Sequence, residues 1–225
     1  MSLVKILKSD VENHPVLRSQ WLLERNISMS FNDLILWLSQ EYFVSIGFVD
    51  WFLRVAAKTR DQNAKIVLVE NIWGELGEGK IEDTHVSILI EFLTKLNFDF
   101  SGHNLLPETK TYLDKMETII EKGFFYGLGA LGPANEYLLK LEYSQIASAY
   151  KKLKTEMALP EGKFFQVNLD ADEGHSQRMF ELIEETAKTK ETQDQVIEGN
   201  LLALAAREDF YTGLTRLDKE PLSLV

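Results

Sequence analysis

The sequence of 225 residues contains no cysteine. This absence excludes disulfide bonds, thiolate nucleophiles, iron–sulfur clusters and cysteine-ligated zinc. It also fits a reducing compartment, and we expect a cytoplasmic protein. Proline and glycine are sparse as well, with 5 and 13 residues respectively, so they divide the chain into long segments rather than many short ones.

Basic residues are in deficit, because 24 lysines and arginines face 35 acidic residues and leave a net charge of −11. A nucleic acid or an anionic membrane surface needs a basic face, so we expect neither partner. No apolar run reaches the roughly 18 residues of a membrane-spanning helix. The longest candidate, residues 34–55, is interrupted by Gln40, Glu41, Asp50 and Arg54, and Lys5 and Lys8 do not fit a secretory signal peptide.

The pattern that is present is helical. Apolar residues recur with helical spacing, and no segment alternates as a strand does. We expect helices at about 2–12, 15–25, 30–58, 61–73, 85–96, 108–122, 124–154, 163–189 and 193–214, with a kink near the middle of 124–154 where Gly127, Gly129, Gly132 and Pro133 fall. No linker or repeat divides the chain, so the sequence predicts one all-α domain over residues 1–225.

Asn168, Asp172 and His175 form the first group that could carry chemistry. Their spacing places all three on one stripe of a helix. An aspartate and a histidine three residues apart can bind one metal ion, as Glu-x-x-His pairs do in di-iron bundles. Taken alone, the same pair fits a solvated or hydrogen-bonded surface pair.

His85 follows two candidate carboxylates. Glu78 lies seven residues before it and would share its face on an unbroken helix, whereas Glu75 lies ten residues before it. Glu75 can reach His85 only if the helix breaks between them, and Gly77 and Gly79 favour such a break. The plain alternative is a charged loop in front of a helix.

Glu136 follows a run of small residues inside an expected interior helix. A buried carboxylate needs a partner, and a metal ion is one such partner. The alternative is a kink that lets this side chain reach solvent. Of the remaining histidines, His14 is expected to start or pack a helix, and His103 to lie in a surface loop.

Several of these pieces occur together, in the same order, in one known superfamily. They are Asn13-His14-Pro15, Gln40-Glu41-Tyr42-Phe43, the run from Asn71 to Gly79 followed by His85, the glycine-rich approach to Glu136, and Arg207-Glu208-Asp209-Phe210-Tyr211. From about residue 10 to 215 the sequence resembles the haem-oxygenase-like (heme oxygenase-like) di-iron oxidases. The superfamily includes TenA thiaminases, the pyrroloquinoline-quinone (PQQ) biosynthesis protein C and CADD-like oxidases.

The resemblance implies a haem-oxygenase-like bundle of about seven helices. By position it also implies the metal ligands Glu75, His85, Glu136, Asp172 and His175, with Glu75 preferred over Glu78 by the family's Glu-x-Gly pattern. Asn168 stands where the family has a further histidine. Because an amide is a poorer iron ligand than imidazole, one ion should be held weakly.

The implied activity is a non-haem iron oxidoreductase with one or two iron ions, or manganese in their place, acting with dioxygen on a small organic substrate. One alternative is a metal-free enzyme like TenA or the quinone-biosynthesis protein. The absence of cysteine argues against a TenA thiaminase, because the resemblance implies a cysteine nucleophile for that chemistry. The small number of basic residues argues against the quinone-biosynthesis protein, which binds a very acidic substrate through arginine and lysine. Another alternative is a non-catalytic interaction protein. The fold is also compatible with a homodimer.

Overall fold

The computed structural model describes residues 2–101 and 104–219, without the side chains of 171–173 and 218–219. Its α-helices are α1 (Leu3–Asn13), α2 (Gln20–Ile27), α3 (Phe31–Ala57), α4 (Gln62–Glu75), α5 (His85–Lys95), α6 (Pro107–Lys122), α7 (Phe124–Leu131), α8 (Leu138–Glu156), α9 (Lys163–Thr186) and α10 (Lys190–Lys219). No strand occurs within these residues, which confirms the all-α prediction. None of the described helices is long and apolar enough to cross a membrane.

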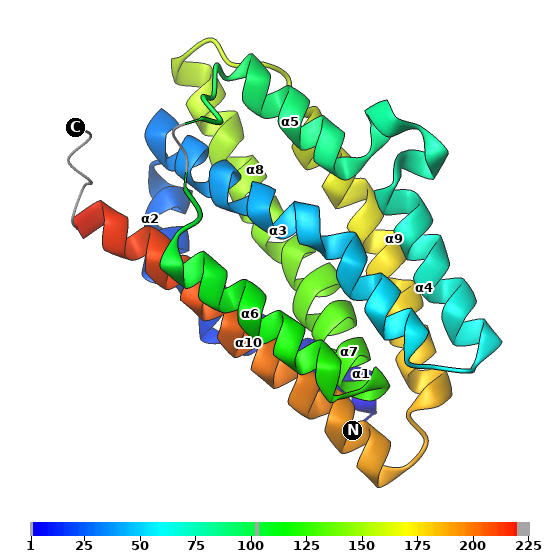
Figure 1. Ribbon diagram of the computed structural model, residues 1–225. Coiled ribbons are helices and arrows are strands. Elements are labelled where there is room, and N and C mark those ends of the chain that lie inside the picture. The colour runs from blue at the N-terminus through cyan, green and yellow to red at the C-terminus, as the bar shows by residue number, and fades with distance from the viewer. Residues whose placement is uncertain (1, 102–103, 220–225) are drawn as a thin grey trace.

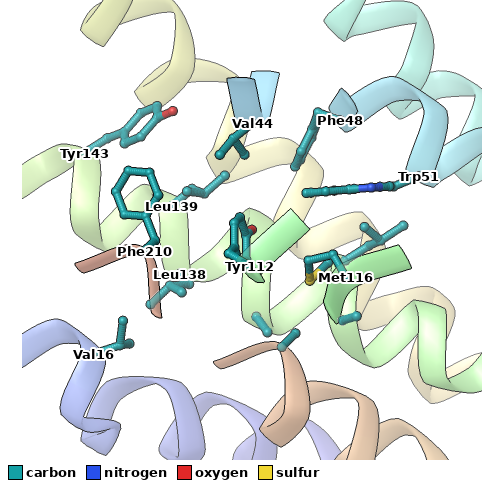
Figure 2. Close-up of a cluster of buried hydrophobic side chains, with 14 of the residues drawn as sticks. Val16, Val44, Phe48, Trp51, Tyr112, Met116, Leu138, Leu139, Tyr143 and Phe210 are labelled. Carbon is teal, nitrogen blue, oxygen red and sulfur yellow. The ribbon is translucent and has the colours of Figure 1, made fainter. Parts of the chain in front are cut away.

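The long helix α3 crosses the middle of the bundle (Figure 1). It begins with a capping box in which Ser30 and Asp33 satisfy each other's backbone N–H groups. Figure 2 shows two of its aromatic side chains, Phe48 and Trp51, facing Tyr112 and Met116 of α6. Each large apolar side chain buried in this way stabilises the fold by about 1.5–3 kcal/mol.

The predicted helix 124–154 is divided in the structure. A π-helical turn, η4 (Gly132–Tyr137), separates α7 from α8 at the place where the kink was expected. Pro133 lacks the N–H group that a regular helix needs, and its ring clashes with the preceding turn. The last helix also differs from prediction, because α10 starts before residue 193 and ends after residue 214.

Gly129 of α7 and Gly199 of α10 have a packing role. A Cβ at Gly129 would lie 2.0 Å from the Val196 carbonyl oxygen, and a Cβ at Gly199 would lie 2.2 Å from the Tyr126 carbonyl oxygen. The two glycines therefore allow α7 and α10 to touch backbone to backbone. This close contact anchors the helix that leads into η4.

Candidate metal centre

Three segments that are distant in sequence bring carboxylate and imidazole groups together. One ligand atom from each of Glu75, Glu136 and His175 lies within 4.8 Å of the others. Glu75 ends α4, Glu136 lies in η4, and His175 lies on α9. His85, the first residue of α5, places its Nδ1 3.0 Å from Glu75 Oε2. Three of the predicted ligands therefore lie within reach of one ion, and a fourth, His85, lies beside Glu75.

Glu75 reaches His85 because the chain breaks after α4. Gly77, Glu78 and Gly79 all have positive φ angles, of 62°, 53° and 86°. A Cβ at Gly77 would lie 2.4 Å from the Asp83 carbonyl carbon, so glycine is required there. The reversal leaves Glu78 exposed on the outside of the turn. The carboxylate beside His85 is thus Glu75, the one that an unbroken helix would have disfavoured.

Glu136 owes its position to the π turn. Its side chain is only 1% exposed, so the alternative in which it escapes to solvent is wrong. Neighbouring Asn135 holds the turn, since its Nδ2 donates to the Ala130 carbonyl 2.7 Å away and its Oδ1 accepts from Tyr112 at 2.8 Å. Single π turns within α-helices occur often at functional sites, where the extra residue redirects a side chain.

His175 lies against the backbone of α4. A Cβ added at Gly74 would be 2.9 Å from its Nε2. The Nδ1 of His175 is 3.7 Å from Glu136 Oε2 and 3.9 Å from Glu75 Oε1. Gly74 therefore leaves the space in which this imidazole sits between the two carboxylates.

Several buried polar atoms in this cluster have no hydrogen-bond partner. They are Glu136 Oε1, Asn71 Oδ1 and the Nδ1 atoms of His85 and His175. His85 Nδ1 is close to Glu75 but lacks the alignment of a hydrogen bond. Unpartnered buried polar atoms are costly and uncommon. A cation that takes lone pairs from carboxylate and imidazole would satisfy them, so these residues fit a metal ion.

The charges of the cluster are coupled. Burial raises the pKa of Glu136, against the opposing effects of His175 and Asn71. Burial alone would lower the pKa of His175, but contact with Glu136 and the charge of Glu75 raise it above its usual value. The pKa of His85 is raised in the same way, with Glu75 outweighing burial. The neighbouring carboxylates thus favour the protonated form of both imidazoles when no metal is bound.

The two remaining predicted residues are placed differently. Asn168 is 8% exposed, and its Nδ2 donates to the Phe164 carbonyl at 2.7 Å, which leaves only its oxygen for a ligand. It lines a cavity of about 20 Å³ together with Glu75 and His85. A volume of this size holds about one water molecule. Asp172 lies among the side chains outside the described residues, as does His103 of the predicted surface loop.

Sequence reasoning missed a second buried charge cluster beside this cavity. Arg207 is 1% exposed, and its Nη2 lies 2.7 Å from Glu142 Oε2 and also pairs with Glu41. Glu41 accepts from the Tyr143 hydroxyl at 3.3 Å, and both residues line the cavity wall. In the sequence, Glu41 interrupts the apolar run 34–55 and belongs to the motif Gln40-Glu41-Tyr42-Phe43. A charge at a core position of a long helix was the available clue.

The predicted role of His14 agrees with its surroundings. Its Nδ1 accepts from the backbone N–H of Val16 at 3.3 Å, at the start of the short 3-10 helix Pro15–Arg18. It therefore starts a helical segment and is not one of the residues that gather around Glu75 and Glu136.

Comparison with known proteins gives a family and a fold. A family model described as iron-containing redox enzyme matches residues 35–208. The 4-chloro-allylglycine synthase of Streptantibioticus cattleyicolor is 26% identical over 171 residues, which cover 72% of this chain and 63% of that protein. The chain therefore spans less than two thirds of the length of this relative.

Solved structures share the architecture over nearly the whole chain. A CADD-like protein of unknown function from Nostoc punctiforme has a TM-score of 0.80 at 19% identity, covering 95% of this chain and 96% of that one. A haem-oxygenase-like domain from Shewanella denitrificans has a TM-score of 0.74 at 17% identity, covering 99% and 93%. A TenA homologue from Pseudomonas syringae has a TM-score of 0.72 at 14% identity, covering 96% and 93%. The predicted haem-oxygenase-like fold is confirmed.

Proposed function

The chain belongs to the family of iron-containing redox enzymes, and from this membership we propose that it is a non-haem iron oxidase acting with dioxygen on a small organic substrate. The observation that carries the proposal is the convergence of Glu75, Glu136 and His175 within 4.8 Å, with His85 beside them. Imidazole and carboxylate together form the ligand type that non-haem iron prefers.

The ligand set supports one firmly bound ion. Glu75, Glu136 and His175 supply two carboxylates and one imidazole within reach of it, and His85 adds a second imidazole beside Glu75. Asn168 offers an amide oxygen at the edge of the cavity, where the family resemblance implies an imidazole. A second ion that used Asn168 and Asp172 would therefore be held more weakly, and manganese could replace iron at either position.

The bound ion would supply dioxygen activation and electron transfer. The protein's own residues set the conditions for this chemistry. Glu75 and Glu136 provide the negative charge that attracts the cation. Because Glu136 is buried, bulk water is kept away from the cation. His85 and His175 must release their protons before they can bind metal, so binding is coupled to proton release.

The substrate class rests on similarity to the 4-chloro-allylglycine synthase, whose name supports a small organic molecule. The cavity beside His85 is too small for such a molecule at about 20 Å³. Substrate binding therefore requires displacement of side chains in the wall, which includes Phe48 and Leu139.

Metal content tests the proposal directly. The protein purified from iron-supplemented cells should contain iron by elemental analysis and should consume oxygen after reduction. Glu75→Gln should lower the iron affinity at least tenfold, because it removes a charged ligand. The matched control Glu78→Gln, three residues further along, should bind iron like the wild type. Folded wild-type protein without iron, or equal behaviour of the two variants, would contradict the proposal and favour a metal-free enzyme on this scaffold.

A further inference from the structure

The outer face of α4 carries a row of exposed apolar side chains. Ile66, Val69 and Trp73 are 54%, 53% and 54% exposed, and Leu76, which follows the helix, is 42% exposed. We call these four residues the α4 stripe. An exposed tryptophan is unusual on a free surface, and large exposed apolar patches mark interaction sites.

The α4 stripe is not the usual polar face of a surface helix. The opposite side of α4 is also apolar where it packs into the bundle, through Ala64, Leu68 and Ile72. A helix that is apolar on both sides is normally buried on both sides. In the single chain only the inner side is covered, and α4 lies at the outer edge of the bundle (Figure 1).

The spacing within the stripe identifies the kind of partner. Positions 66, 69, 73 and 76 are separated by three, four and three residues, which is the repeat of a seam between two helices. Lys65 and Glu70 flank the seam on opposite sides, five residues apart. In a parallel pair of identical helices, Lys65 of each copy faces Glu70 of the other. In an antiparallel pair that sets residue 66 against residue 76, Lys65 faces residue 77 of the other copy and this pairing is lost.

We propose that the α4 stripe is the interface of a homodimer in which the α4 helices of two copies pack in parallel about a two-fold axis. A symmetric dimer uses the same patch on both copies, so one self-complementary stripe is sufficient. Trp73 would be the main anchor, as buried tryptophans often are at interfaces. Glu70 already pairs with Arg178 of α9, so Lys65 of the second copy joins an existing ion pair.

The interface and the metal cluster lie on opposite sides of one helix. Asn71, Gly74 and Glu75 face inward from the same turns that carry Trp73 and Leu76 outward. A dimer would therefore brace the end of α4 from outside. The proposal itself rests on the exposed stripe and does not depend on the identity of the bound metal.

Size-exclusion chromatography with light scattering on the full chain tests the interface. The wild type should have twice the mass of one chain. Val69→Glu places two like charges against each other across the axis and should weaken dimerisation roughly 100-fold. The matched control Leu201→Glu alters a residue of α10 that is 44% exposed and should remain dimeric. A monomeric wild type, or a dimer unaffected by Val69→Glu, would overturn the proposal.

Cross-linking tests the orientation. Since the chain has no cysteine, single substitutions give unambiguous disulfides. In a parallel seam each residue faces its own copy, so Ile66→Cys and Val69→Cys should both form covalent dimers under mild oxidation, while Leu201→Cys should not. An antiparallel seam places residue 66 opposite residue 76. Failure of Ile66→Cys to cross-link in a protein that is dimeric would refute the parallel arrangement.

Discussion

The substitution Gly74→Ala should weaken metal binding without destabilising the fold. The new methyl group would lie 2.9 Å from His175 Nε2 and 3.1 Å from its Cε1, closer than ordinary van der Waals contact. The imidazole must shift by a few tenths of an ångström or rotate. Displacing a ligand through a neighbour of this kind typically costs 10–100-fold in metal affinity, or about 1.4–2.7 kcal/mol.

The same change should spare the apoprotein. Gly74 lies within α4 and has no positive φ angle, so alanine gains helix propensity of up to about 1 kcal/mol. This gain offsets the small cost of moving the far end of the His175 side chain. We therefore expect the free energy of unfolding without metal to change by less than about 1 kcal/mol.

Two measurements check this prediction. Anaerobic calorimetric titration with Fe(II) or Mn(II) gives the affinity, and urea unfolding gives the stability of the apoprotein. Gly47→Ala is the matched control, because a Cβ there would meet nothing within 4 Å. It should gain stability and leave the affinity unchanged. If Gly74→Ala binds metal as tightly as the wild type, His175 is not a ligand. If it loses metal only together with stability, the steric reasoning is wrong.

Three further outcomes are expected. Asn168→His should raise the iron content per chain in elemental analysis, because imidazole binds iron better than an amide, and unchanged content would argue against Asn168 as a ligand. The stabilisation of the apoprotein by protonated His85 and His175 should be complete below about pH 6.5 and should be lost as the pH rises through their raised pKa values. The affinity for Mn(II) should rise over the same pH range, because metal binding releases these protons. Urea unfolding with and without Mn(II) measures both trends. Arg207→Met leaves two buried carboxylates without a counter-charge and should lower the free energy of unfolding by about 3–5 kcal/mol in urea, whereas a loss below 1 kcal/mol would show that the cluster is not coupled to folding.

Much of the fold could be predicted from local pattern. Helical spacing of apolar residues gave the all-α class, and most helix boundaries fell within a few residues of the structure. The kink in 124–154 followed from Pro133, since the lack of one N–H group acts locally. The ends of α9 and α10 were less accurate, because helix ends depend on contacts that spacing does not record.

The candidate site, like the fold, was predictable from the sequence only in part. Residue types and the family resemblance singled out Glu75, His85, Glu136 and His175, and the glycines at 77 and 79 predicted the break that Glu75 needs. The Arg207 cluster was not anticipated. Its members come from α3, α8 and α10, and no spacing in the sequence links residues that meet only through packing.

The sequence by itself determined the helices, the break after α4 and the donor types available for a metal, because each of these depends on neighbours within a few residues. Only the tertiary structure decided which donors meet and which carboxylates are buried. It also left one apolar face of α4 uncovered. Those features depend on how α3, α4, α8, α9 and α10 pack against one another, and burial is a property of that packing rather than of any single segment.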